Sequence, residues 1–225
     1  IGILAVDPSS PFNFGSLLGD RIRLAEHFNN ANVFIRSVAT RGSLGGLSDK
    51  VVEITDVMRA FPFDYIFIET VGVGQSEVEI AGLADTTVVV LVPEAGDEIQ
   101  TMKAGLMEIA DIFVVNKSDR TEADRFSKNL RMLAASRMTK EWQIPVVKTI
   151  AISGEGVDQL LNQINLHHQS GIDNLRKPIL LAEKCWRIIQ KERMKTVNKS
   201  QLIEDISKAA LEDDFNLYRF SKKYY

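Results

Sequence analysis

The stretch Ile66–Glu77 decides the fold, and its sequence is IFIETVGVGQSE. A short apolar run ends in Glu69, and Gly72 and Gly74 follow it. Apolar runs bounded by glycine are typical of strands buried on both faces of a parallel sheet, where ligands bind beyond the carboxyl ends of the strands. An acid at that edge suits Mg²⁺, and glycine amides that can approach closely suit a terminal phosphate. On this stretch alone, a solvent-exposed glutamate before a glycine turn is an equally good interpretation.

A second motif follows another apolar run. Ile112–Val115 is followed by Asn116–Asp119, which has the pattern N-K-x-D. An aspartate in this place can accept two hydrogen bonds from guanine, at the ring N1–H and at the exocyclic amine, and adenine offers no such pair. Buried paired hydrogen bonds discriminate strongly because the wrong base leaves them unmade. The four-residue pattern is weak by itself and gains weight from its place after a strand.

Alternating strands and helices predict an α/β fold with a doubly wound, mostly parallel sheet and a C-terminal helical extension. We predict a helix whose core face holds Val51, Ile54, Val57 and Phe61, and we expect Cys185 to be a buried, inert thiol. His167 and His168 are expected at a helix end rather than in a metal site, because adjacent helical residues do not share a face. The expected strands are 2–6, 33–38, 65–68, 87–92, 112–115 and 146–151.

Composition excludes several classes of protein. The 225 residues carry a formal net charge of −3, so there is no broad basic signature for nucleic acid or for anionic membrane. No apolar run is long enough to span a bilayer. A single cysteine permits no internal disulfide and fits a reducing cytoplasm, which is where we expect the protein.

The motifs together resemble the MeaB/ArgK-type GTPases, which are chaperones of methylmalonyl-CoA mutase and were formerly called LAO/AO transport system ATPases. The resemblance covers most of residues 1–166 and includes the unusual string ETVGVGQSE. It implies a P-loop-NTPase-like fold that binds GTP or GDP with Mg²⁺. The matching stretches are Ala5–Ser10, Leu18–Arg21, Glu69–Glu77, Ala95–Glu98 and Asn116–Asp119.

The resemblance also implies roles for individual residues. Mg²⁺ would be organised by Asp7, Asp20 and Glu69, although Asp20 is also a plausible helix N-cap. Gly72 would contact the γ-phosphate, and Gln75 would orient the attacking water unless it is simply an exposed loop residue. The guanine base would be held by Asn116, Lys117, Asp119 and the backbone amide of Ala151. A switch segment that signals to the partner would include Asp97, Glu98 and Lys103, which as plain sequence fit a capped helix start.

One family motif does not occur in these residues. The Walker A pattern G-x-x-x-x-G-K-[S/T] is absent, and Ile1–Asp7 resembles the family's second strand. The amides and lysine of that loop are the main partners of the α- and β-phosphates. We therefore expect these 225 residues to be a fragment that binds GTP poorly, an expectation that micromolar GTP binding would contradict.

The expected organisation is a GTPase domain over residues 1–170, without its first strand and P-loop, and a helical dimerisation arm over residues 171–225. By resemblance the partner is a cobalamin-dependent acyl-CoA mutase, and the protein is a homodimer that uses neither nucleic acid nor membrane. Two alternatives remain open: a non-enzymatic interaction scaffold, and a GTPase or ATPase that serves amino-acid transport or metal insertion.

Overall fold

The computed structural model describes residues 1–7, 24–39, 49–70, 81–93, 104–136, 142–172, 176–211 and 214–224. The chain divides into two compact units, Ile1–Leu180 and Leu181–Tyr225. The first sheet of the larger unit has the strand order β2-β1-β3, with β1 at Gly2–Asp7, β2 at Phe34–Ala39 and β3 at Ile66–Thr70. Both pairings are parallel, so the carboxyl ends of the three strands share one edge. A short 3₁₀ helix, η1 (Ala25–His27), precedes β2.

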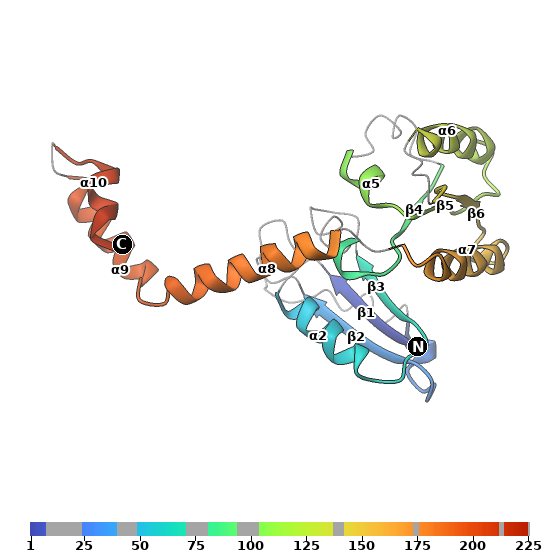
Figure 1. Ribbon diagram of the computed structural model, residues 1–225, viewed down its shortest axis with the longest axis horizontal. Helices are drawn as coiled ribbons and strands as arrows, with labels where there is room; N and C mark the ends of the chain where they lie inside the picture. The colour runs from blue at the N-terminus through green and yellow to red at the C-terminus, as the bar shows by residue number, and fades with distance from the viewer. Residues whose placement is uncertain are drawn as a thin grey trace. The chain divides into compact units, whose positions relative to one another are not determined.

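Helix α2 (Asp49–Arg59) lies beside the first sheet and packs against its central strand, β1 (Figure 1). Its buried residues are Val51, Val52, Thr55 and Met58, which join Leu4 and Val6 of β1 in one core. The predicted core face was therefore wrong at Val57, whose side chain is 60% exposed, and at Phe61, which lies beyond the end of the helix. Thr55 is buried on this face instead of Val57 and Phe61. Its hydroxyl can be buried because it donates a hydrogen bond to the Val51 carbonyl at 2.8 Å.

The second sheet has the order β4-β5-β6, again with parallel pairs. Its strands are β4 (Val88–Leu91), β5 (Ile112–Val115) and β6 (Val146–Lys148), and β5 is buried along its whole length. Helices α5 (Ala104–Ile109) and α6 (Ala123–Ala135) contribute to the core around Phe113 and Val115. Helix α7 (Val157–Gln169) lies on the side opposite α6 (Figure 1).

Helix α7 also connects the two sheets. Just before β3, the Tyr65 hydroxyl bonds the Asn165 side chain at 2.9 Å, and just before β4, the Thr86 hydroxyl lies 2.8 Å from His167 Nδ1. Asn165 and His167 are two residues apart in the last turns of α7, so β3 and β4 both begin near that end of the helix. The candidate nucleotide residues follow the other, carboxyl, ends of the strands.

The predicted α/β class with parallel strands is confirmed. The described strands, however, form two three-stranded sheets, in which β3 and β4 are edge strands. No strand among the described residues pairs with the outer edge of either of them. In the part of the chain that the structure describes, no helix is both long enough and apolar enough to cross a membrane.

The smaller unit is helical and begins within α8 (Arg176–Arg193). Helix α9 (Lys199–Ala209) follows, capped by Asn198, and α10 (Leu217–Ser221) continues into the 3₁₀ helix η2 (Lys222–Tyr224). Cys185 on α8 is exposed, which corrects the expectation of a buried thiol. The physical reason is that the neighbouring apolar residues of α8, including Trp186, are exposed as well.

A tyrosine–carboxylate hydrogen bond holds η2 to α9. The Tyr224 hydroxyl donates to Asp205 Oδ2 at 2.9 Å. Partial burial raises the pKa of Tyr224, and the hydrogen bond to Asp205 raises it further. The stabilisation from neutral Tyr224 is therefore fully present below the ordinary tyrosine pKa near 10 and is lost as the pH rises through the raised value.

We expect the chain to resist urea better than Tyr224→Phe at pH 8 and to have a smaller advantage at pH 11. Circular dichroism at the two pH values measures it. Tyr218→Phe, which removes an exposed hydroxyl from the same unit, is the control and should behave as the parent does. An advantage that persists unchanged at pH 11 would contradict the assignment.

Candidate functional site

The site that the structure describes best is formed by the loops that follow β5 and β6. The Ser118 amide donates to the Thr149 carbonyl at 3.0 Å, and the Thr149 amide donates to the Val115 carbonyl at 2.9 Å. Lys117 has φ of 56°, and it is the one non-glycine residue with positive φ in the described ranges. A left-handed lysine is disfavoured by about 1–2 kcal/mol and persists where its surroundings fix it.

Asn116 joins the two loops through its side chain. Its Oδ1 accepts the Ala151 amide at 3.1 Å and the Thr149 hydroxyl at 3.3 Å. The structure thus brings together two residues that the sequence assigned to guanine binding. The Ala151 amide, proposed as a donor to the base, donates to Asn116 here, so a guanine O6 would have to share or replace this bond.

The second loop is closed by its own backbone. The Ile150 amide donates to the Glu155 carbonyl at 2.9 Å, and the Ser153 and Gly154 amides both turn back to the Ile150 carbonyl. Gly156 ends the loop with φ of 78°, against the Lys148 carbonyl oxygen. A Cβ at Gly156 would overlap that oxygen, so this position requires glycine. This role was not predicted from the sequence, although a glycine just before a helix is a recognisable signal.

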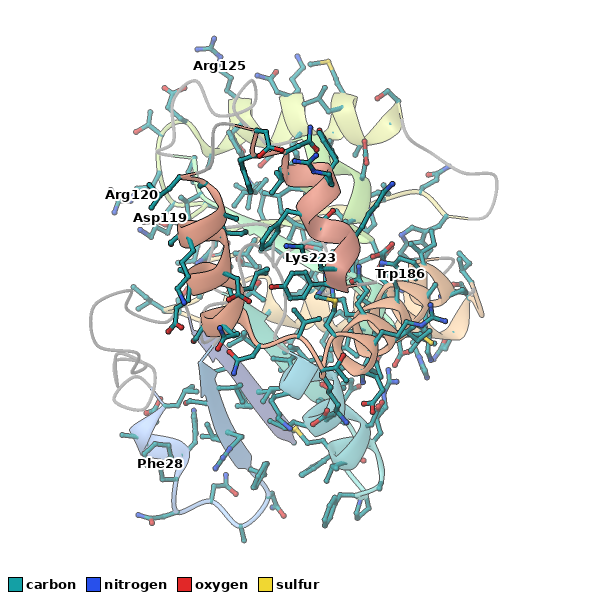
Figure 2. All side chains as sticks on the ribbon, turned by 90° about the vertical axis from the view of Figure 1, so that its left-hand side faces the viewer. Phe28, Asp119, Arg120, Arg125, Trp186 and Lys223 are labelled. Carbon is teal, nitrogen blue, oxygen red and sulfur yellow. The ribbon has the colours of Figure 1, made fainter. Side chains whose placement is uncertain are left out.

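Lys117 and Asp119 complete the predicted base-binding set, and both side chains are exposed. Asp119 and Arg120 lie at the surface in Figure 2. An exposed carboxylate in the loop that also holds Asn116 is accessible to a base from solvent. The geometry can therefore offer an acceptor for N1–H and the exocyclic amine close to the loop that would face O6.

The residues proposed for Mg²⁺ are only partly described. Glu69 lies in β3, where it is the register partner of Ala5, and Asp7 ends β1 two residues later. Two of the three proposed carboxylates therefore come from the same end of neighbouring parallel strands. The side chain of Asp7 and the whole of Asp20 lie outside the described residues, among which no group of three metal-ligating side chains occurs. Carboxylate oxygens fit the preference of Mg²⁺.

The remaining predicted site residues lie outside the described part of the chain. They are Gly72, Gln75, Asp97, Glu98 and Lys103.

His167 has a packing role in the structure. Its side chain is buried, contacts Thr86 through Nδ1, and meets the Trp142 ring edge-on at 4.8 Å between centroids. Its Nε2 lies 3.9 Å from Asp111 Oδ1, and Asp111 in turn accepts the Thr87 amide. These contacts tie the end of α7 to the amino ends of β4 and β5, away from the loops that follow β5 and β6.

Parallel strands that alternate with helices, with an N-K-x-D loop at the carboxyl end of β5, match the class of P-loop-type nucleotide-binding domains. The chain belongs to the family described as "Methylmalonyl Co-A mutase-associated GTPase MeaB", whose model matches residues 1–210. This confirms the family resemblance drawn from the motifs.

Individual relatives agree with that assignment. A protein of Pyrococcus abyssi is 48% identical over 201 residues, which cover 88% of this chain and 60% of that protein. The mouse "Methylmalonic aciduria type A homolog, mitochondrial" is 40% identical over 202 residues, or 84% of this chain and 48% of that protein. The crystal structure titled "LAO/AO transport system kinase" shares the fold with a TM-score of 0.63, at 24% identity over 99% of this chain and 70% of that chain. The chain thus spans about half to two-thirds of the length of these relatives.

Proposed function

We propose that the protein is a Mg²⁺-dependent GTPase whose guanine site is formed by the loops after β5 and β6. The observation that carries this proposal is the hydrogen bond between Asn116 and Ala151, which joins the two residues assigned to the base from different strands. The match to a family of GTPases supports it. In this proposal Asp119 selects guanine, and the Lys117 side chain lies beside the base.

In this proposal the phosphates of the nucleotide bind at the carboxyl ends of β1 and β3. Glu69, with Asp7 and Asp20, would hold Mg²⁺, which neutralises charge on the phosphate oxygens. The Gly72 amide would contact the γ-phosphate, and Gln75 would orient the water that attacks it. Phosphoryl transfer depends mainly on such positioning, so no strong base is needed.

The α- and β-phosphates require a Walker A segment that these residues do not contain. Among the described strands, β3 and β4 each have an edge at which a further parallel strand could pair, and Phe67 on β3 and Val90 on β4 leave apolar surface exposed. Glycine-rich phosphate loops follow strands, so such a strand would carry the loop to the nucleotide edge.

The test compares these 225 residues with a chain extended by the codons upstream of Ile1. We expect hydrolysis of GTP by the extended chain, its loss when EDTA removes Mg²⁺, and little hydrolysis by the shorter chain. An extended chain that contains G-x-x-x-x-G-K-[S/T] and still hydrolyses no GTP would contradict the proposal and favour the non-enzymatic scaffold.

The proposed biological role is that of a chaperone for a cobalamin-dependent acyl-CoA mutase, in the cytoplasm. The family description, which names methylmalonyl-CoA mutase, supports the partnership. In this role Asp97, Glu98 and Lys103 would signal the nucleotide state to the mutase. Affinity capture followed by mass spectrometry separates the alternatives: a mutase subunit supports the role, whereas a permease or a metalloenzyme precursor contradicts it.

We further propose that residues 1–170 form the GTPase domain and that residues 171–225 form an arm that pairs with a second copy. On α8, Ile179, Trp186 and Ile189 recur at a spacing suited to a helix–helix seam, and all three are exposed (Trp186 in Figure 2). An exposed apolar stripe of this kind is unfavourable in a monomer.

We expect Trp186→Ala to convert a dimer into a monomer, because it removes the largest side chain of the seam. Light scattering after size exclusion measures the mass. Met132→Ala truncates a similarly exposed side chain on α6 and is the matched control, expected to leave the dimer intact. A dimer of unchanged stability in Trp186→Ala would count against the seam.

A further inference from the structure

Lys148 immediately precedes the Ala151 loop and contacts the beginning of the helix that follows each of the two base-binding loops. It is the last residue of β6, immediately before Thr149. Its Nζ lies 2.7 Å from Asp124 Oδ1 in the first turn of α6, the helix that follows the Asp119 loop. Its carbonyl oxygen lies against Gly156, the N-cap of α7, which follows the Ala151 loop. One residue therefore contacts the beginning of the helix that follows each loop.

The ion pair is well formed for a surface position. The side chain of Lys148 is 39% exposed, so part of its stem is covered, whereas that of Asp124 is 87% exposed. The hydrogen bond from Lys148, followed by its positive charge, holds the pKa of the Asp124 carboxyl below its usual range. Asp124 also lies at the positive end of the α6 dipole, where a carboxylate is favoured.

The direct bonds between the loops join Asn116 and Ser118 to the Thr149–Ala151 segment. None of these direct bonds includes the Asp119 side chain. Asp119 is separated from Asp124 by one turn and the start of α6, where the Arg120 amide donates to the Lys117 carbonyl and the Ala123 amide donates to the Arg120 carbonyl. The residue before Asp119 is thus held directly at the Thr149 carbonyl, and the Lys148–Asp124 pair adds a second connection on the other side of Asp119, through α6 and β6.

We propose that the Lys148–Asp124 ion pair is a positioning element for guanine selection, holding Asp119 at the distance from the Ala151 loop that one purine ring requires. This inference rests on the proposed guanine site and adds two residues that act through others. The isolated pair contributes little to stability, as exposed ion pairs do, so its effect should fall on base selection more than on folding.

The test titrates the 225-residue chain with GMP and IMP, followed by amide shifts in ¹H–¹⁵N spectra. IMP lacks the exocyclic amine, so the ratio of its Kd to that of GMP reports how well Asp119 is placed. We expect Lys148→Met to weaken GMP about fivefold and IMP less, which lowers the ratio. Asp124→Asn should do the same, and the double variant should add little to either single change because the two residues act as one unit.

Two further variants separate positioning from general loosening. Lys148→Arg keeps the charge and should restore the ratio to near the parent value. Lys50→Met breaks an exposed 2.9 Å ion pair to Glu53 on α2 and should leave the ratio unchanged. A Lys148→Met chain with the parent ratio, or with equal losses for both nucleotides, overturns the positioning role alone. A parent chain that does not distinguish GMP from IMP overturns the guanine site and this inference with it.

Discussion

Asp119→Asn is expected to exchange guanine for xanthine. The parent carboxylate accepts from both N1–H and the exocyclic amine of guanine, whereas an asparagine accepts from N1–H and donates at the second position. Xanthine carries a carbonyl where guanine carries the amine, so it matches the variant and GMP does not. We expect GMP affinity to fall by roughly 100-fold. The variant loses a charge-assisted hydrogen bond, and its amide N–H faces the exocyclic amine of guanine, so two donors oppose each other.

Amide-shift titration with GMP and xanthosine monophosphate measures the exchange. Asp64→Asn is the matched control, since it removes the same charge from an exposed aspartate in the loop between α2 and β3. It should leave the preference for GMP intact. An Asp119→Asn chain that still prefers GMP over xanthosine monophosphate would show that Asp119 does not read the base.

Gly156→Ala is expected to have the second-largest effect. Its φ of 78° disfavours any side chain, and the added methyl would overlap the Lys148 carbonyl oxygen. Left-handed backbone costs about 1–2 kcal/mol, and steric overlap in a closely packed place adds roughly 1–3 kcal/mol. The overlap should also displace the connection between the Ala151 loop and α7, so GMP affinity should fall as well.

Gly154→Ala is the matched control for the overlap. Gly154 has the same φ of 78°, but a Cβ there meets nothing within 4 Å. Urea unfolding of both variants isolates the contribution of the Lys148 contact as the difference between them. Equal destabilisation by the two changes would contradict the proposed close approach.

The strands were predictable from the sequence because strands buried on both faces have continuous apolar runs. Ile112–Val115 is the clearest case, with all four side chains buried. The last strand was predicted too long, since it ends at Lys148 and Thr149 already belongs to the loop. Apolar character continues through Ile150, so hydropathy alone could not show where pairing stops.

Helix faces were predicted less well for a physical reason. On α2 the buried Thr55 appears polar in sequence, and its hydroxyl becomes acceptable in a core only through the bond to Val51. On α8 the opposite error occurred at Cys185, because an apolar stripe predicts burial without saying what covers it. The first error concerns a hydrogen bond within the helix, and the second concerns what packs on the helix from outside.

The N-K-x-D motif indicates a base site at Asn116 and Asp119 through its own chemistry, and this assignment stays a prediction. The bond from the Ala151 amide to Asn116 follows from the neighbouring positions of β5 and β6. The Lys148–Asp124 pair joins residues 24 apart, and nothing in either local sequence marks them. Such contacts arise from tertiary packing and require the structure.

The most direct test of guanine recognition is a comparison of GMP with AMP on the ¹⁵N-labelled 225-residue chain. We predict that GMP shifts amides in Asn116–Asp119 and Ile150–Ile152, and that AMP at the same concentration leaves them in place. Equal shifts with both nucleotides, or GMP shifts confined to other segments, would contradict it.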